Sequence, residues 1–564
     1  MKKSQKNTPS FKIALIATAC ICVLQSDVVL AQTGPSSADV LRNIEQNKID
    51  FNRSLPKPAA LQENASVHTV EGFSRLKEVR VNSPMYPQEL MAYWNSEIDK
   101  PVSTQKLSDF QAFAWNLFQR KGYLAYITSS TESTPDGTVL TVNASLPIVG
   151  KVFVVTTEGS KGKEFADEVT RRFSAIYKSG ATVDVLGFEN QLNAATFDLP
   201  VDLEVSMRQT SSSVVDVVIH LRPAEAQTGK VLGGVLQINN YGLEQFGRMQ
   251  LLGNVRIGGI TPLSELTLTT QQSTGVGYYR ADYEAPVIAT GLRWKVYGSD
   301  VKSQSVSTHG LSQEFGGGLT KLLSTDRTGR WLATAEVSRR QTQNWTAGVV
   351  TANRVDQQLR LKLRAESSKG WVDNFNNELI LTTGYINLDR FDNDKTYDAS
   401  TLKVAGTYQK LEMNGGLSHT LDKHGIYTGA IRWRAQAASN NLDGYNKISL
   451  GGINGMRSYS SIDGVGDQGA QLSFDLTHQV VPDVWGGLFY DIGTVKNDHR
   501  PLLSSTTSSA YLLQGAGMQF GGTIDKTHWT LSMALAIGKK PSTWTAANTQ
   551  PGDMRINFAI TKPF

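Results

Sequence analysis

Residues 229 to 564 contain many segments in which apolar and polar residues alternate. The clearest is 358–366, where Leu and Ala alternate with Gln, Arg, Lys and Glu, and 292–297 and 431–437 repeat the pattern. A period of two puts apolar side chains on one face of a β-strand and polar ones on the other. A soluble sandwich alternates too. The number of segments and an export signal at the chain start favour a membrane β-barrel, in which pairing around the ring satisfies every backbone group.

The alternation predicts sixteen strands, an even number as in bacterial barrels. A cation facing lipid would cost about 2–4 kcal/mol at the bilayer midplane, so we expect the cations opposite the apolar face to point into a water-filled lumen. The apolar residues of the last segment, Ile556, Phe558, Ile560 and Phe564, share one parity. The predicted strands are 231–240, 247–257, 264–273, 277–285, 292–302, 312–322, 330–341, 355–367, 376–388, 400–412, 426–437, 469–480, 486–495, 510–521, 528–538 and 555–564.

Residues 1–31 are predicted to be a secretory signal peptide, because four lysines accompany an apolar core and a small-residue cleavage site precedes Gln32. A lipoprotein site at Cys20 is disfavoured, since Ala17 stands where Leu is expected. The only cysteines, Cys20 and Cys22, fall in this segment. The mature chain would have none, which suits export to an oxidising compartment.

The net charge of +5 lies mostly in the signal peptide, where four Lys minus Asp27 give +3 and leave +2 for the rest. The charge therefore gives no argument for a nucleic-acid partner. No other run of about 18 apolar residues follows, so we expect no transmembrane helix after cleavage.

An N-terminal helix and a linker are expected in 32–65. Residues 36–51 carry a short helical pattern, with Asp39 placed to cap it. Pro56 and Pro58 make the next residues a linker that cannot be helical throughout.

Two similar units follow, 66–146 and 147–223, each with the predicted order strand, helix, helix, strand, strand. Each ends in a pair of strands, and in the second unit 201–207 and 214–221 alternate as a closing hairpin. We expect the apolar stripes of the helices to form cores rather than ligand sites. The stripes are Leu90, Trp94, Ile98; Leu107, Phe110, Ala114, Leu117; Phe165, Val169, Phe173, Ile176; and Phe188, Leu192, Ala195.

One stretch, 450–493, combines a loop rich in Gly, Ser and Asp with a later alternating strand. The loop contains Arg457 and Tyr459. On the strand, Phe489, Asp491 and Gly493 share one face, opposite an apolar face.

This stretch resembles the signature region of two-partner secretion transporters (TpsB), members of an outer-membrane superfamily that joins periplasmic POTRA domains to a β-barrel. In that family a long loop folds back into the barrel with a Val-Arg-Gly-Tyr/Phe tip, and a later strand carries Phe-x-Asp-x-Gly. Arg457 and Tyr459 match the tip, and Phe489, Asp491 and Gly493 match the strand. The resemblance implies that an in-folding loop, 438–468, is locked to the barrel where Arg457 meets the inward Asp491.

Two positions depart from the family pattern. Met456 replaces Val, which is a mild change. Ser458 replaces Gly, which puts a tight backbone approach in question because Gly tolerates conformations that Ser does not.

The resemblance also implies the architecture: a transmembrane β-barrel of about sixteen antiparallel strands (229–564), preceded by two α+β POTRA domains and an N-terminal helix that plugs the pore. Asp491 falls on the thirteenth predicted strand, as in the family. The terminal Phe564 resembles the signal read by the machinery that assembles outer-membrane barrels.

The implied function is protein secretion. The chain would sit in the outer membrane with its POTRA domains in the periplasm, recognise an unfolded adhesin- or haemolysin-like exoprotein, and pass it through the barrel. Its other partners would be periplasmic chaperones, the barrel assembly machinery and outer-membrane lipids. The alternative is an assembly factor of the same superfamily. A passive porin would leave the two N-terminal units unexplained.

No enzyme motif is found: there is no phosphate loop, no Gly-x-Ser-x-Gly elbow and no His-Glu-x-x-His. His419 and His424 are near each other but lack a third ligand, so neither a metal site nor a cofactor is expected. We expect no catalytic activity.

Overall fold

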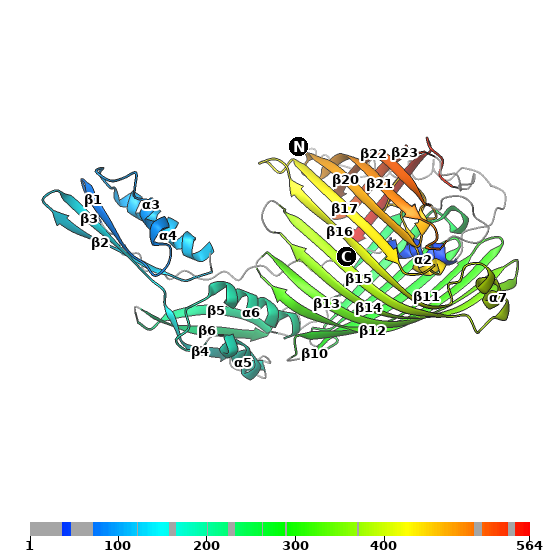
Figure 1. The fold of residues 1–564 in the computed structure, drawn as a ribbon, viewed down its shortest axis with the longest axis horizontal. Coiled ribbons are helices and arrows are strands. Elements are labelled where there is room, and N and C mark those ends of the chain that lie inside the picture. Colours follow the sequence, from blue (N-terminus) through cyan, green and yellow to red (C-terminus); the bar gives the residue numbers. More distant parts are fainter. Residues whose placement is uncertain are drawn as a thin grey trace, which may run out of the picture.

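The structure of the protein is a computed structural model (Figure 1). It describes 37–46 and 71–564, apart from 121, 157–164, 177, 200, 212, 224–231, 262, 288–289, 327, 369–371, 501–509 and 540–547. The predicted signal peptide with Cys20 and Cys22, and the predicted linker with Pro56 and Pro58, lie outside the described residues.

Sixteen strands of the described chain form a closed antiparallel barrel, which confirms the predicted fold class. Each strand pairs with its neighbours along the chain, and the last, β24, pairs with the first, β7. The strand that carries Asp491 is thirteenth in order. The strands are β7 (Leu232–Asn239), β8 (Gln250–Gly258), β9 (Glu265–Ser273), β10 (Val276–Val287), β11 (Leu292–Gln304), β12 (Thr308–Thr325), β13 (Gly329–Thr346), β14 (Val349–Ser367), β15 (Asn374–Asn387), β16 (Gly406–Thr420), β17 (Tyr427–Ala438), β20 (Gln468–Val481), β21 (Val484–Lys496), β22 (Ala510–Ile524), β23 (Thr527–Ala536) and β24 (Met554–Pro563).

The seam between the last and first strands is closed by Phe564. Its N–H donates to the Gly234 carbonyl at 3.0 Å, and the Gly234 N–H donates to its carbonyl at 2.9 Å. The Phe564 ring lies over Gly234, so a Cβ there would come within 2.4 Å of the ring. Glycine at 234 therefore makes room for the terminal aromatic side chain.

Two small α+β units precede the barrel, each with a three-stranded sheet and two helices in the predicted order. In each sheet the third strand lies in the middle, parallel to the first and antiparallel to the second. The first unit comprises β1 (Leu76–Asn82), α3 (Pro87–Ala92), α4 (Thr104–Arg120), β2 (Tyr126–Thr134) and β3 (Gly137–Ser145). The second comprises β4 (Ile148–Thr156), α5 (Ala166–Ile176), α6 (Val185–Asp198), β5 (Val201–Gln209) and β6 (Val214–Pro223).

The aromatic residues of the helices form the cores of these units. Trp94 and Phe110 are fully buried in the first, and Phe173 is fully buried in the second. The predicted place of Ile98 on the first stripe is wrong, because α3 ends at Ala92 and the chain continues in turns that leave Ile98 exposed.

The second unit contacts the barrel through the end of α6. The Asp198 carboxylate accepts a hydrogen bond from the Gly291 N–H at 2.9 Å, in the turn between β10 and β11. The same carboxylate holds both terminal nitrogens of Arg172 on α5, at 2.9 and 2.7 Å. Burial alone would lower the pKa of Arg172, but its pairs with Asp198 and Glu168 raise the pKa above the ordinary value. One buried carboxylate thus joins α5 to the barrel turn.

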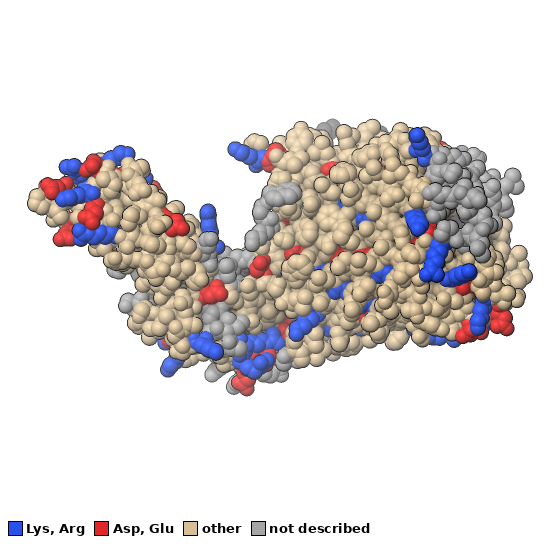
Figure 2. Space-filling model, in the orientation of Figure 1, with Lys and Arg blue, Asp and Glu red and all other residues tan. Residues whose placement is uncertain are grey.

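The outer wall of the barrel is largely free of charge in the view of Figure 2, whereas Lys, Arg, Asp and Glu gather on the first unit. Aromatic side chains flank the apolar wall near the end that carries the small units, as in the interfacial girdles of outer-membrane barrels. These residues are Tyr283, Trp294, Trp331, Phe375 and Trp529.

Several strand limits differ from the prediction at the end opposite the small units. Strands β12, β13 and β14 begin or end several residues further out, in segments such as 341–346 where apolar and polar residues do not alternate. Alternation fails there because neither face meets lipid.

The tenth strand was predicted at 400–412 but spans Gly406–Thr420. Part of the predicted range belongs to a helix, α7 (Asp392–Ser400), and to the loop after it. The strand runs on through Gly415, where the ring of Trp433 on β17 fills the space of the missing side chain. The pair Gly415-Gly416 would be typical of a turn, but here it lies within a strand and an aromatic ring packs against it.

Candidate functional site

The segment between β17 and β20, 439–467, folds back into the barrel lumen (Figure 1). It contains a 3-10 turn, η4 (Gly444–Asn446), and a minimal hairpin of β18 (Ile448–Ser449) and β19 (Val465–Gly466). Its apolar residues pack with the inner wall in one buried cluster. The cluster is Ile448, Leu450, Met456, Tyr459, Val495, Leu513 and Ala536.

Arg457 at the loop tip binds Asp491 on β21 through three hydrogen bonds. Its terminal nitrogen lies 2.7 Å from one carboxylate oxygen, and its Nε and backbone N–H lie 3.1 and 2.9 Å from the other. The Arg457 side chain is 3% exposed and that of Asp491 is 0% exposed. Charge-assisted bidentate contacts of this kind are stronger than neutral hydrogen bonds and fix geometry.

Arg457 also contacts residues that the sequence analysis did not single out. Its second terminal nitrogen lies 2.5 Å from Asp475 on β20 and 3.1 Å from Gln519 on β22. Gln519 donates to Asp475 at 3.0 Å. The sequence does place Asp475 on the polar face of an alternating strand. In the structure it pairs in register with Phe489. The register across strands, which brings these side chains together, cannot be seen in one strand alone.

The remaining matched residues hold the loop tip against the barrel wall. Phe489 lies beneath it, 3.6 Å from the guanidinium carbon to the ring centroid, a cation–π contact. The Tyr459 hydroxyl donates to the Gln514 carbonyl at 2.9 Å. At Gly493 a Cβ would lie about 3.0 Å from Leu450 and 3.1 Å from Met456, so the small residue lets the loop approach the wall.

Ser458 is fully buried and faces Gly515 on β22. Its hydroxyl has no hydrogen-bond partner among the described residues. A Cβ at Gly515 would lie 2.0 Å from that hydroxyl oxygen, which no relaxed structure allows. In the family pattern, Gly at the position of Ser458 would leave space between loop and wall. Here Gly515 on the wall leaves that space instead.

A short helix, α2 (Ser37–Gln46), also lies in the lumen, against β11, β12 and η4 (Figure 1). Val40 and Ile44 pack with apolar residues at the loop-bearing end, namely Leu243, Phe246, Val276, Tyr278 and Val301. The Asn43 amide donates to the Tyr241 carbonyl at 2.9 Å and to Ser461 of the in-folded loop at 3.0 Å. Arg42 donates to the Gly444 carbonyl of the same loop.

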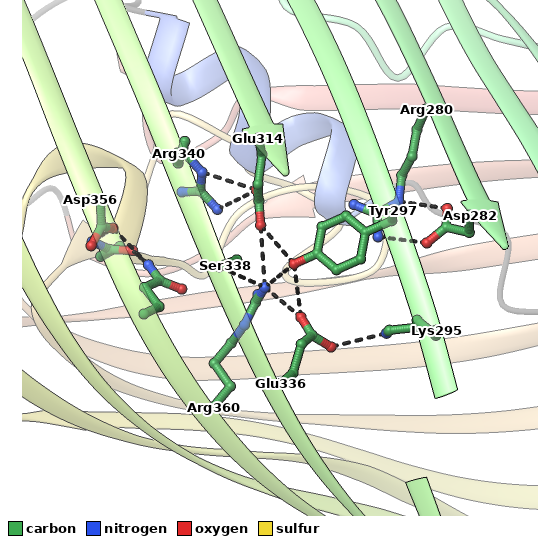
Figure 3. Close-up of polar contacts among 12 residues, drawn as sticks. Arg280, Asp282, Lys295, Tyr297, Glu314, Glu336, Ser338, Arg340, Asp356 and Arg360 are labelled. Atoms are coloured by element: carbon green, nitrogen blue, oxygen red, sulfur yellow. Dashed lines mark hydrogen bonds and ion pairs between the residues drawn. The ribbon is translucent and has the colours of Figure 1, made fainter. Parts of the chain in front are cut away.

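Charged residues line the wall beside α2, as predicted for the lumen (Figure 3). Glu336 on β13 pairs with Lys295 at 2.9 Å and Arg360 at 2.5 Å. Glu314 on β12 pairs with Arg340 at 2.9 Å. This wall is polar and internally paired, so it exposes little apolar surface to the lumen.

No helix among the residues described is long and apolar enough to cross a membrane. Within the same residues, no group of three His, Cys, Asp or Glu side chains is arranged to hold a metal ion. His419 lies 3.7 Å from Asp373.

A closed barrel that contains a folded-in loop and follows two α+β units defines an outer-membrane protein of the POTRA-and-barrel class. The sequence profile of the haemolysin secretion/activation proteins ShlB/FhaC/HecB matches residues 223–518, more than half of the chain. The chain therefore belongs to this family and is an outer-membrane transporter of the two-partner secretion (TpsB) type, with its N-terminal units in the periplasm. No curated protein sequence matches it.

Solved structures share the fold. CdiB from Escherichia coli has a TM-score of 0.59 at 15% identity, covering 95% of this chain and 100% of CdiB. CdiB from Acinetobacter baumannii has a TM-score of 0.55 at 13% identity, covering 98% and 97%. BamA from Haemophilus ducreyi lacking POTRA domains 1–3 has a TM-score of 0.52 at 12% identity, covering 87% and 100%.

We predict that Arg457→Ala and Asp491→Ala each lower export of the partner exoprotein while the barrel still reaches the membrane. Losing one partner of a buried ion pair costs about 3–5 kcal/mol, and the closed ring does not depend on the loop. The double variant should be little worse than either single one, because the interaction is already lost. Export is measured in culture supernatants and barrel folding by the gel shift on heating.

The matched control is Arg256→Ala, which removes a lumenal ion pair with Glu265 between neighbouring strands, away from the loop. Export should stay near the wild-type level in that variant. Fully additive losses in the Arg457 and Asp491 double variant would show that the two residues act separately.

A second prediction concerns the contact of Ser458 with Gly515. Gly515→Ala should weaken the loop and lower export, since its Cβ collides with the Ser458 hydroxyl. Ser458→Gly should rescue Gly515→Ala, because the nearest atom to the new Cβ outside Ser458 is the Leu535 carbonyl oxygen at 3.5 Å, an ordinary contact. Export and the thermal unfolding midpoint of the purified protein are the readouts. If Ser458→Gly fails to rescue either one, the collision is not the cause of the defect.

Proposed function

We propose that the chain captures an unfolded exoprotein in the periplasm and passes it through its own barrel. The observation that carries this proposal is the position of α2. This helix occupies the lumen, and the segment that follows it connects it to the first periplasmic unit. Residues 47–70 connect it to the first unit, and 24 residues can span at most about 86 Å when extended. The helix can therefore leave the lumen and remain tethered.

The contacts of α2 suit a plug that is released. Val40 and Ile44 are its large buried apolar side chains, and the Asn43 and Arg42 side chains bind the wall and the loop through hydrogen bonds. A buried aliphatic side chain contributes about 1.5–3 kcal/mol, and a net hydrogen bond about 1 kcal/mol. A binding partner of ordinary affinity can supply free energy on that scale.

The in-folded loop is proposed to have a different role. It is attached to the barrel at both ends and is held by the buried pair of Arg457 and Asp491, which would act as a lock between loop and wall. Phe564, seated at the seam, is proposed to be the signal for barrel assembly.

Capture is proposed to occur at the sheet edges of the two periplasmic units. In the sheet orders β1-β3-β2 and β4-β6-β5, the outer strands have one side unpaired within the sheet. Strand addition at such an edge reads the backbone of an extended peptide more than its side chains. An unfolded polypeptide of varied sequence meets that requirement.

The second candidate, an assembly factor for other barrels, is favoured by the shared fold with BamA. The experiment that separates the two functions compares cells with and without this protein. Loss of one large secreted polypeptide from the supernatant supports secretion, whereas a general loss of outer-membrane barrels supports assembly.

The release of α2 leads to a further prediction. Ala38 and Gly444 are close enough for a disulfide, since a Cβ at Gly444 would lie 3.2 Å from that of Ala38, slightly under the usual separation. The residues from 37 onward contain no cysteine, so Ala38→Cys with Gly444→Cys creates one possible bridge. Export should stop when the bridge forms and return on reduction.

Each single cysteine variant serves as the control and should export under both conditions. Bridge formation is followed by the altered migration of the protein on a non-reducing gel. Unchanged export with the bridge fully formed would contradict the requirement that α2 leaves the lumen.

A further inference from the structure

We propose that the outer wall of the barrel across β12–β15 binds a phosphorylated, acylated glycolipid of the outer leaflet, of the lipid A type. The starting observation is a row of directly paired residues that crosses four strands. Phe315 pairs with Arg339, Arg339 with Gln357, and Gln357 with Tyr385. All four are exposed, so an arginine stands on the face of the barrel that meets the membrane.

Two hollows adjoin this row. The first, of about 250 Å³, is polar and contains a second arginine from the loop after β15; it is lined by Arg339, Val355, Gln357, Tyr385, Asn387 and Arg390. The second is a larger groove of about 780 Å³ that shares Arg339, Gln357 and Tyr385. It extends along the wall toward the periplasmic end over Val337, Leu359 and Thr383.

The two arginines differ from those of the lumen. Arg340, the next residue on β13, points inward and pairs with Glu314 at 2.9 Å. Neither the Arg339 nor the Arg390 guanidinium has an ion-pair or hydrogen-bond partner in the part of the chain that the structure describes. A guanidinium on the lipid face without a counterion is unfavourable, and the planar group binds phosphate through two parallel hydrogen bonds.

The height of the row fits a headgroup. Trp331 marks the periplasmic girdle on the same strand, and Arg339 lies eight residues further on. At about 3.3 Å per residue and a tilt of about 40°, that distance is roughly 20 Å of a band about 25 Å tall. Arg339 therefore reaches the level of the outer-leaflet headgroups.

The groove below the row explains why a lipid rather than a free anion is the occupant. Gly317 on β12 leaves the wall low between Phe315 and Val337, and the groove lining is mainly apolar. A soluble phosphate compound has no apolar chain to bury in this groove. An acyl chain that descends from a phosphate held by Arg339 and Arg390 would lie in it.

The test uses the full-length protein, purified in detergent and examined by native mass spectrometry with added bisphosphorylated lipid A. We expect lipid A to be retained by the wild type and bound at least about tenfold more weakly by Arg339→Gln with Arg390→Gln, as for loss of a charge-assisted bidentate contact. Lys302→Gln is the control, since Lys302 is an exposed outward cation on β11 that lines neither hollow. Its affinity should equal that of the wild type.

Folding of each variant is checked by the gel shift on heating, and both Arg positions are also tested as single Lys variants, which keep the charge. Dephosphorylated lipid A should bind at least about tenfold more weakly than the bisphosphorylated form. Equal retention by the double Gln variant, equal binding of dephosphorylated lipid A, or equal competition by phosphatidylglycerol would each overturn the proposal.

Discussion

The structure depends on one constraint, that a backbone in the hydrocarbon of a bilayer must pair all of its hydrogen-bonding groups within the protein. Strands meet this requirement only when the first and last are joined. The joint between β24 and β7 is the shortest pairing in the ring, with five residue pairs from Ala559 to Pro563. The reciprocal hydrogen bonds of Phe564 and Gly234 extend it by one step. The aromatic ring of Phe564 lies over Gly234 and covers the end of this strand pairing.

Closure then decides what each face of a strand can carry. Most outward residues meet lipid and are apolar, and inward residues can be charged because they pair with one another, as Glu336 does with three cations. The inward face also receives 439–467 and α2 without a large apolar core. A lumen built this way accepts inserts through polar contacts, which can be exchanged for contacts with water or with another chain.

The barrel could be predicted from the sequence because the alternation is imposed by lipid along most of each strand. The prediction of strand limits from alternation failed where the strand does not face lipid. The outer ends of β12 to β14 do not alternate regularly, and Gly415 continues a strand beside the ring of Trp433. The pair of Arg457 and Asp491 was reached through short motifs, whereas Asp475 and Gln519 come from strands whose register no single segment reveals. The outward Arg339 breaks the rule that cations point inward, and the sequence alone does not distinguish it from Arg340.

The two inserts in the lumen are held by different kinds of interaction, and this difference supports the proposal that the loop stays in place while the helix is released. The loop is joined to the wall at both ends, and its tip is bound by a buried bidentate ion pair with a ring beneath it. Breaking that contact leaves a buried charge without its partner, which is strongly unfavourable. The helix is joined at one end and held through groups that water can replace. Because Asn43 and Arg42 bind the loop itself, the loop forms part of the surface against which the helix packs. An altered loop tip would therefore act on the helix as well, through contacts of the helix with Ser461 and Gly444 rather than through the barrel wall.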